Sequence, residues 1–227
     1  TLRSEGSGGV VNLSSAIDLT STASTNLSVE GASINLDAGV STDGGSISFT
    51  GPVEINAAVP VDSESGGDSA AGAVSFSSTI LAEDGSSDTL TIDATGSSNG
   101  TITLSGDVGD GTSANDLDAF TISQSSIADL ADIQVDSGNI AITSSDIDLN
   151  GDTYKANTSG SITFTGPVGL DSTGSITIQT ANADSDDLSF SSTIDDTGND
   201  SNLIINTNNG TASAPGGESG DLTFSGS

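Results

Sequence analysis

The stretch Gly45-Ser46-Ile47-Ser48-Phe49-Thr50-Gly51-Pro52-Val53 returns 115 residues later as Gly160-Ser161-Ile162-Thr163-Phe164-Thr165-Gly166-Pro167-Val168, and the two copies differ only at Ser48 and Thr163. Apolar and hydroxyl residues alternate in both, which is the pattern of a half-buried β-strand, because successive side chains of a strand point to opposite faces. Proline lacks an amide hydrogen and fixes its own backbone angle, so Gly51-Pro52 ends the strand and turns the chain. The sequence therefore repeats a unit of one strand followed by one turn.

Looser versions of this unit recur at 73–80, 101–108, 187–194 and 221–226. Inside the long interval the spacing is close to 27 residues, since Ile47 to Val74 is 27 and Val74 to Ile102 is 28. A period of roughly 20–50 residues is typical of solenoids and repeat arrays. The spacing drifts in Gly-, Ser- and Asp-rich segments such as 62–72, which have loop composition and can bulge outward without breaking a stack.

These repeats predict an all-β protein of about 19 short strands. A parallel β-helix places stacked strands in the same surroundings, so they should resemble one another, whereas each strand of a sandwich has its own surroundings. We therefore predict one continuous parallel β-helix over 1–227, with a long repeat at approximately 12–126 and 127–227. The alternative is a tandem array of antiparallel β-sandwich domains. Segment 127–132 is ambiguous and could form a helical turn.

Composition restricts the function classes. The chain has 227 residues and a net charge of −30, with 32% hydrophobic residues. Such values usually indicate disorder, but here the apolar residues fall in alternating runs, and a thin one-dimensional core needs fewer of them. Arg3 and Lys155 are the only Arg and Lys, so the basic footprint for nucleic acid or an anionic membrane is missing. No cysteine is available for disulfides.

The sequence contains neither a recognisable signal peptide nor an apolar run long enough to span a membrane. The first and last residues belong to the repeat pattern, so we expect an excerpt from a longer polypeptide. An acidic, self-repelling surface suits an exterior with salt or divalent cations that screen it.

The strand repeats resemble those of giant bacterial surface proteins of the filamentous-haemagglutinin type. The stretches that carry this resemblance are 160–168, 188–196 and 146–154, and it extends over most of the chain. The resemblance implies a right-handed parallel β-helix, secretion to the cell surface and a structural or adhesive role. The amino-terminal secretion domain of that family is not part of this sequence, which leaves the export route open.

Catalysis has little support, because the chain holds no His or Cys for a nucleophile–base pair and few cations to stabilise an oxyanion. An enzyme acting on acidic polysaccharides would meet a surface of the wrong sign. We assign no catalytic, cofactor-binding or metal-binding residues. Calcium is the one ion for which the sequence offers a candidate motif, because 146–152 matches the first positions of an EF-hand loop. Its twelfth position, however, is Asn157 instead of the bidentate Glu, and alternation with Ile147 and Leu149 favours a strand with solvent-facing acids.

Other polar features have ordinary explanations. Asp and Asn favour turns, and this accounts for the acidic loops. The adjacent Tyr154 and Lys155 could mark a binding site, although a single Tyr more often covers the core. Thr101 and Thr103 resemble the outward Thr rows of ice-binding solenoids but do not repeat in register. The acidic loop residues are Asp107, Asp110, Asp116, Asp118, Asp195, Asp196 and Asp200. Chance explains the Asn-x-Ser/Thr triplets, because the chain is rich in Ser and Thr. These triplets begin at Asn12, Asn26, Asn99, Asn157 and Asn209.

The sequence thus predicts a non-catalytic, structural or adhesive segment of a long extracellular fibre on a bacterial surface. The alternative function is that of calcium-stiffened β-sandwich adhesin repeats that bind a partner or glycan. Self-association, end to end or laterally, and a cell-surface or glycan partner are compatible with either. Binding to nucleic acid and insertion into a membrane are not expected.

Overall fold

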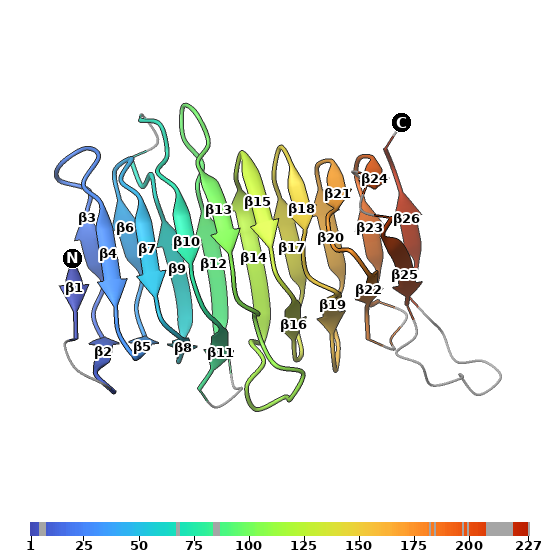
Figure 1. The fold of residues 1–227 in the computed structure, drawn as a ribbon, viewed down its shortest axis with the longest axis horizontal. Coiled ribbons are helices and arrows are strands. Elements are labelled where there is room, and N and C mark those ends of the chain that lie inside the picture. Colours follow the sequence, from blue (N-terminus) through green and yellow to red (C-terminus); the bar gives the residue numbers. More distant parts are fainter. Residues whose placement is uncertain are drawn as a thin grey trace.

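A computed structural model describes residues 1–4, 8–66, 69–83, 87–181, 183, 185–196, 198, 200–207 and 220–226. The chain winds as a right-handed parallel β-helix of nine coils, and the coils stack along the longest axis of the molecule (Figure 1). Each coil contributes one strand to each of three faces, A, B and C, in that order along the chain, except that the fifth coil joins face B only through the bridge residue Val108.

Nine strands form face A: β1 (Leu2–Arg3), β4 (Leu27–Glu30), β7 (Ile47–Thr50), β10 (Val74–Phe76), β13 (Thr101–Leu104), β15 (Ile127–Leu130), β18 (Ile147–Leu149), β21 (Val168–Leu170) and β24 (Ile194–Asp196). Nine more form face C: β3 (Ile17–Leu19), β6 (Val40–Thr42), β9 (Ala58–Asp62), β12 (Thr89–Asp93), β14 (Ala119–Gln124), β17 (Ile140–Thr143), β20 (Ile162–Thr165), β23 (Leu188–Phe190) and β26 (Leu222–Phe224).

Face B consists of two four-stranded sheets joined through Val108, which forms parallel bridges to Ile80 and to Ile133. Its strands are β2 (Val10–Leu13), β5 (Ser33–Leu36), β8 (Val53–Ile55), β11 (Ile80–Ala82), β16 (Ile133–Val135), β19 (Thr153–Ala156), β22 (Ser175–Gln179) and β25 (Asn202–Asn206). The described residues form no helix long and apolar enough to cross a membrane.

All pairings between these strands are parallel. The antiparallel sandwich alternative is therefore wrong. The spacing argument identified the correct fold, because Val74 pairs with Ile47 on one side and with Ile102 on the other. Loops absorb the variation in coil length: 28 residues separate Val74 from Ile102, but 19 separate Ala128 from Ile147.

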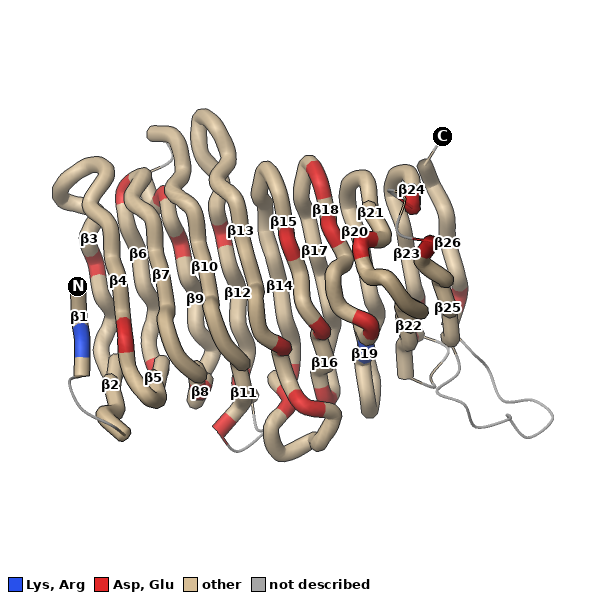
Figure 2. Tube along the Cα trace, viewed as in Figure 1, with Lys and Arg blue, Asp and Glu red and all other residues tan. Residues whose placement is uncertain are grey.

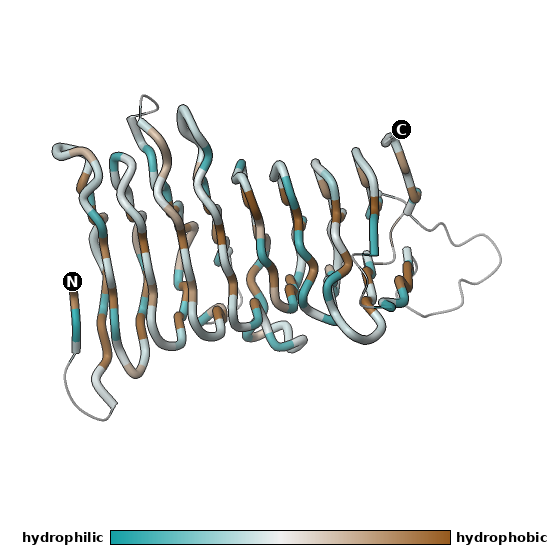
Figure 3. Tube along the Cα trace, turned by 45° about the horizontal axis from the view of Figure 1, so that its top comes forward, coloured by the Kyte–Doolittle hydropathy of each residue, from teal (hydrophilic) through white to brown (hydrophobic). Residues whose placement is uncertain are grey.

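Columns of apolar side chains fill the interior. In every internal strand the residues at alternate positions are buried. In β13, for example, Ile102 and Leu104 are buried, whereas Thr101 and Thr103 are half-buried. Figure 3 shows hydrophobic segments that recur at similar places in successive coils. Two columns contain stacked aromatic rings, with centroids 4.7 Å apart in the pair Phe49–Phe76 and 5.2 Å apart in Phe164–Phe190. Such offset stacks add to the burial of apolar area.

The corner after the repeated strand (β7 in the first copy and β20 in the second, called the signature strand) explains why this strand is followed by glycine. Gly51 has φ of 123°, and a Cβ placed on it would lie 2.0 Å from the carbonyl oxygen of Gly31 in the previous coil. Gly166 in the second copy has φ of 138° and the same close approach, at 1.9 Å from the oxygen of Ser144. Both backbone angle and space therefore require glycine.

The two copies of the signature strand lie on different faces. Ile47 and Phe49 belong to β7 on face A, whereas Ile162 and Phe164 belong to β20 on face C. The interval of 115 residues is consequently not a whole number of coils, and the copies share a local conformation without sharing neighbours.

Segment 127–132 does not form the helical turn that its sequence allowed. Ile127–Leu130 is strand β15, with Ala128 and Leu130 buried between Ile102 and Leu104 of the previous coil and Ile147 and Leu149 of the next. The ladder on both sides decides the conformation, because an unpaired turn here would leave the backbone groups of two neighbouring strands unsatisfied.

Candidate functional site

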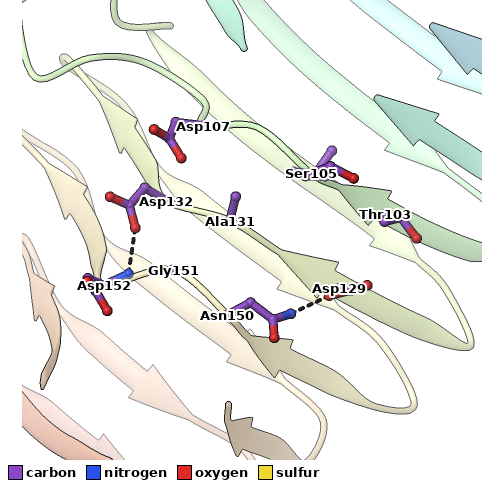
Figure 4. Close-up of a pocket in the computed structure, with 10 residues that line it drawn as sticks. Thr103, Ser105, Asp107, Asp129, Ala131, Asp132, Asn150, Gly151 and Asp152 are labelled. Carbon is purple, nitrogen blue, oxygen red and sulfur yellow. Dashed lines mark hydrogen bonds between the residues drawn. The ribbon is translucent and has the colours of Figure 1, made fainter. Parts of the chain in front are cut away.

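A depression of about 400 Å³ lies at the corner between faces A and B. We call it the A–B groove. It crosses three coils, and side chains of the strand ends and following turns line it (Figure 4). Its lining residues are Thr103, Leu104, Ser105, Asp107, Asp129, Ala131, Asp132, Asn150, Gly151 and Asp152.

Parallel stacking brings these residues together although up to 49 positions separate them in the sequence. Thr103 pairs with Asp129, and Asp129 pairs with Asp148, so one outward position of three successive coils forms a row. Neighbouring strands lie about 4.8 Å apart. An acidic residue that recurs at one position of the coil therefore forms a line of carboxylates on the surface.

Hydrogen bonds within the groove occupy much of this polar surface. The Oδ1 atom of Asp132 accepts from the backbone amides of Asp152 at 2.5 Å and Thr153 at 3.0 Å. Asn150 donates its side-chain amide to Asp129, as drawn in Figure 4. Desolvation raises the pKa of Asp107, and the nearby charge of Asp132 raises it further. The carboxylates hold turns of adjacent coils together and give the groove a negative potential.

The row on face A also contains Asp148, which does not line the groove. Partial burial raises the pKa of Asp148 to about 6, and the charges of Asp146, Asp171 and Asp129 contribute in the same direction. Like charges at this spacing disfavour simultaneous ionisation. Acidic residues spread along the length of the molecule (Figure 2), whereas Arg3 belongs to β1, the first strand of face A.

The EF-hand-like segment does not wrap around a common centre. Ile147–Leu149 is a strand with both apolar side chains buried, as alternation indicated. Asp152 accepts a hydrogen bond from Ser172, and the twelfth residue, Asn157, donates to Asp116 at 2.6 Å. In the described part of the chain no three acidic side chains are grouped so that they could hold a metal ion. Calcium stays a hypothesis of the alternative function, and no residues are assigned to it.

Several of the other acids accept hydrogen bonds from the backbone of their own turns. Asp110 accepts from the amide of Thr112 at 2.9 Å and from Asn115 at 2.6 Å, and its pKa is lowered by the hydrogen bonds from Thr112 and Asn115. Asp116 is fully buried and accepts from the amides of Asp110 and Gly111. Further turn caps are Asp18, Asp62, Asp93, Asp186 and Asp196. Asp118 instead joins coils, because it accepts from the amide of Ser87 and the hydroxyl of Ser137.

Tyr154 belongs to the core, and Lys155 belongs to the surface. The Tyr154 ring is fully buried, and its hydroxyl donates to the carbonyl of Leu130 at 2.8 Å and accepts from the amide of Gly151 at 3.1 Å. Burial raises the pKa of this hydroxyl. Lys155 points outward on face B, paired in register with Gln134 and Gln179. The two residues therefore do not form one site.

The remaining sequence features spread over the surface. The row of Thr103 continues as Asp129 and Asp148, so the ice-binding pattern does not extend. Of the Asn-x-Ser/Thr triplets, the one at Asn209 lies outside the described residues.

The A–B groove was not predicted, because its residues become neighbours only when the length of each coil is known. The recurrence of Asp at corresponding coil positions would have been the signal.

Comparison of the chain with protein-family models, with curated proteins and with solved structures gives no match in any of the three.

Proposed function

We propose that this chain is a non-catalytic structural segment of a long bacterial surface fibre or adhesin. The observation that carries the proposal is the continuous stack itself. Nine coils share one apolar interior, and three faces of parallel ladders enclose it. A stack of this kind lengthens by adding coils, each of which contacts only its neighbours. Spanning distance is the function that such an architecture serves most directly.

Chemistry and charge support the same proposal. The chain contains no His or Cys, and only Arg3 and Lys155 could stabilise a developing negative charge. The A–B groove is open and acidic, and its carboxylates mostly accept hydrogen bonds from neighbouring turns. A net charge of −30 keeps the chain soluble and suits a saline or cation-rich exterior. The extracellular location and the adhesive role follow from the resemblance described above.

Immunolabelling of intact cells tests the location. Antibodies raised against the purified chain are applied to source cells before and after permeabilisation, with a cytoplasmic protein as the control antigen. We expect the chain to be labelled on intact cells while the control is labelled only after permeabilisation. Labelling of the chain that requires permeabilisation would contradict an extracellular role.

Small-angle scattering tests the structural role. Eight intervals of about 4.8 Å give a stack of about 40 Å. We expect this particle to keep the same dimensions from low to high salt and in the presence of calcium or a chelator. A large change in shape with calcium would favour a regulated binding module over a passive spacer.

A further inference from the structure

The outward side of face C carries threonine-rich rows that run from coil to coil. At the middle of each strand the outward residue pairs in register with that of the next coil. From β12 to β23 this central row consists of Thr91, Thr121, Ala141, Thr163 and Ser189, all of them half-buried. A second row lies two residues further along the strands and consists of Ser123, Thr143, Thr165 and Ser191. We call the two rows together the threonine face.

The threonine face is an array with two nearly perpendicular repeats. Neighbouring strands lie about 4.8 Å apart, and residues two positions apart on one strand lie about 6.6 Å apart. The Oγ atom of Ser189 donates to the Oγ1 atom of Thr163 at 3.2 Å, so hydroxyl groups of adjacent coils are close neighbours in the row. Threonine is restricted at χ1, and the alternate residues Ile142, Ile162 and Phe164 are at most 1% exposed. Both side chain and backbone therefore hold the array in place.

This face is uncharged although the chain has a net charge of −30. Strands β14, β17, β20 and β23 contain no Asp, Glu, Lys or Arg, and Asp62 and Asp93 lie on the strands that precede them, β9 and β12. On face A the outward positions of β15, β18 and β24 instead hold Asp129, Asp148 and Asp195. An uncharged surface can contact the threonine face without desolvating a carboxylate, which is costly.

Ice is the partner whose surface has matching properties. It is uncharged and crystalline, and the oxygen atoms on the prism face of hexagonal ice repeat in two perpendicular directions at spacings close to those of the array. A threonine hydroxyl donates and accepts as a lattice water does, and its methyl group is covered without loss of a hydrogen bond. Because the array is rigid, little side-chain freedom is lost on binding. A polysaccharide fits less well, since neither row contains an aromatic ring on which a sugar could stack.

We propose that the threonine face binds the surface of ice crystals. Contacts that are weak at one coil add up when several coils meet the same flat crystal face. The pattern that ends at Thr103 on face A is thus present on face C, where the register of the coils assembles it. This inference goes beyond the proposed function, because a fibre that spans distance without contacting ice would satisfy that function and still refute ice binding.

Partitioning into growing ice tests the proposal. A dilute, stirred solution of the purified chain is frozen slowly onto a cold probe together with serum albumin, and gel densitometry compares both proteins in the ice and in the remaining liquid. A slowly growing crystal excludes solutes that do not bind to it, so albumin reports the exclusion. We expect the chain to be enriched in the ice at least about tenfold over albumin, the ratio that about 1.4 kcal/mol of preference gives.

Thr121→Tyr and Thr163→Tyr each place a ring in the middle of the threonine face and keep a residue that favours strands. Each should lower the enrichment about tenfold, because the ring holds neighbouring coils away from the crystal and a gap of about 1 Å already forfeits up to half of the dispersion attraction. Thr177→Tyr is the matched control, since Thr177 is a half-buried outward residue of β22 on face B. This control should be enriched as wild type is.

Far-ultraviolet circular dichroism before freezing and after thawing confirms folding, and Thr121→Lys replaces a face C variant that loses its β signal. Wild type that is excluded from ice as albumin is would overturn the proposal, and so would equal enrichment of wild type and the face C variants. Sedimentation velocity examines a second copy as the occupant of the face. A wild-type dimer that Thr163→Tyr dissociates, without enrichment in ice, would assign the face to self-association and would also overturn ice binding.

Discussion

Replacing Gly51 by alanine should destabilise the protein through two separable effects. The backbone at φ of 123° is a conformation that L-residues rarely adopt, which costs about 2 kcal/mol. The new Cβ would lie 2.0 Å from the Gly31 oxygen, so the two coils must move apart. That movement weakens the adjacent hydrogen bond from the Gly31 amide to the Thr50 carbonyl, now 3.1 Å long, at a further cost of about 1 kcal/mol. The expected loss is about 3 kcal/mol.

Two other glycines in internal coils separate these effects. Gly111 has φ of 82°, but its nearest neighbour is the end of the flexible Gln134 side chain at 2.9 Å. Gly111→Ala should therefore cost only the backbone strain, about 1–2 kcal/mol. Gly174 has no such φ, and its nearest neighbour is 3.8 Å away. Gly174→Ala should be about 0.5 kcal/mol more stable than wild type, because it restricts the unfolded chain.

Urea unfolding followed by far-ultraviolet circular dichroism measures all three variants. With a slope of about 3 kcal/mol per molar urea, the Gly51→Ala midpoint should fall by about 1 M. Amide hydrogen exchange at Gly31 should also accelerate in this variant and in neither control. Equal midpoints for Gly51→Ala and Gly174→Ala would refute the account of the corner.

Three further predictions concern the core and the acidic face. In a double-mutant cycle of Phe49→Leu and Phe76→Leu, the unfolding free energies should reveal a coupling of about 0.5–1.5 kcal/mol from the ring stack, and additive effects would contradict it. Tyr154→Phe should lower the unfolding free energy by about 1 kcal/mol, since it removes the 2.8 Å hydrogen bond to the Leu130 carbonyl while the amides of Asn150 and Gly151 still donate to that oxygen; an unchanged urea midpoint would show that this bond contributes nothing. The native state holds the Asp148 proton up to about pH 6 and the unfolded chain releases it near 3.8, so stability should fall as pH rises through this window. Asp148→Asn should flatten that slope in urea midpoints measured between pH 4 and 7, and an identical slope in wild type and variant would count against the shifted pKa.

The fold class followed from local chemistry that any reader of the sequence can apply. Alternation of Ile47 and Phe49 with serines predicts a strand, and Gly51-Pro52 predicts its end. Spacings of 27 and 28 residues between Ile47, Val74 and Ile102 predict stacking, and these three residues are indeed paired neighbours. These properties depend on nearest residues and on one period, so sequence reasoning can reach them.

Which residues meet across coils could not be predicted in the same way. Each coil has its own length, and an error of a few residues in one loop displaces every later coil. For this reason the repeat of 115 residues gave no warning that Ile47 lies on face A and Ile162 on face C. The same uncertainty concealed the A–B groove, whose carboxylates at Asp107 and Asp132 come from different coils.

The sequence by itself determined that the chain forms short strands with one apolar side, ended by Gly, Asp and Asn turns, and that it carries a net charge of −30 without His or Cys. Only the tertiary structure decided the face of each strand, the strand conformation of Ile127–Leu130 and the carboxylate row at Asp129 and Asp148. The physical reason is that a strand's alternation is a property of consecutive residues, whereas register is set by loop lengths and by ladder hydrogen bonds between residues about 20–28 positions apart.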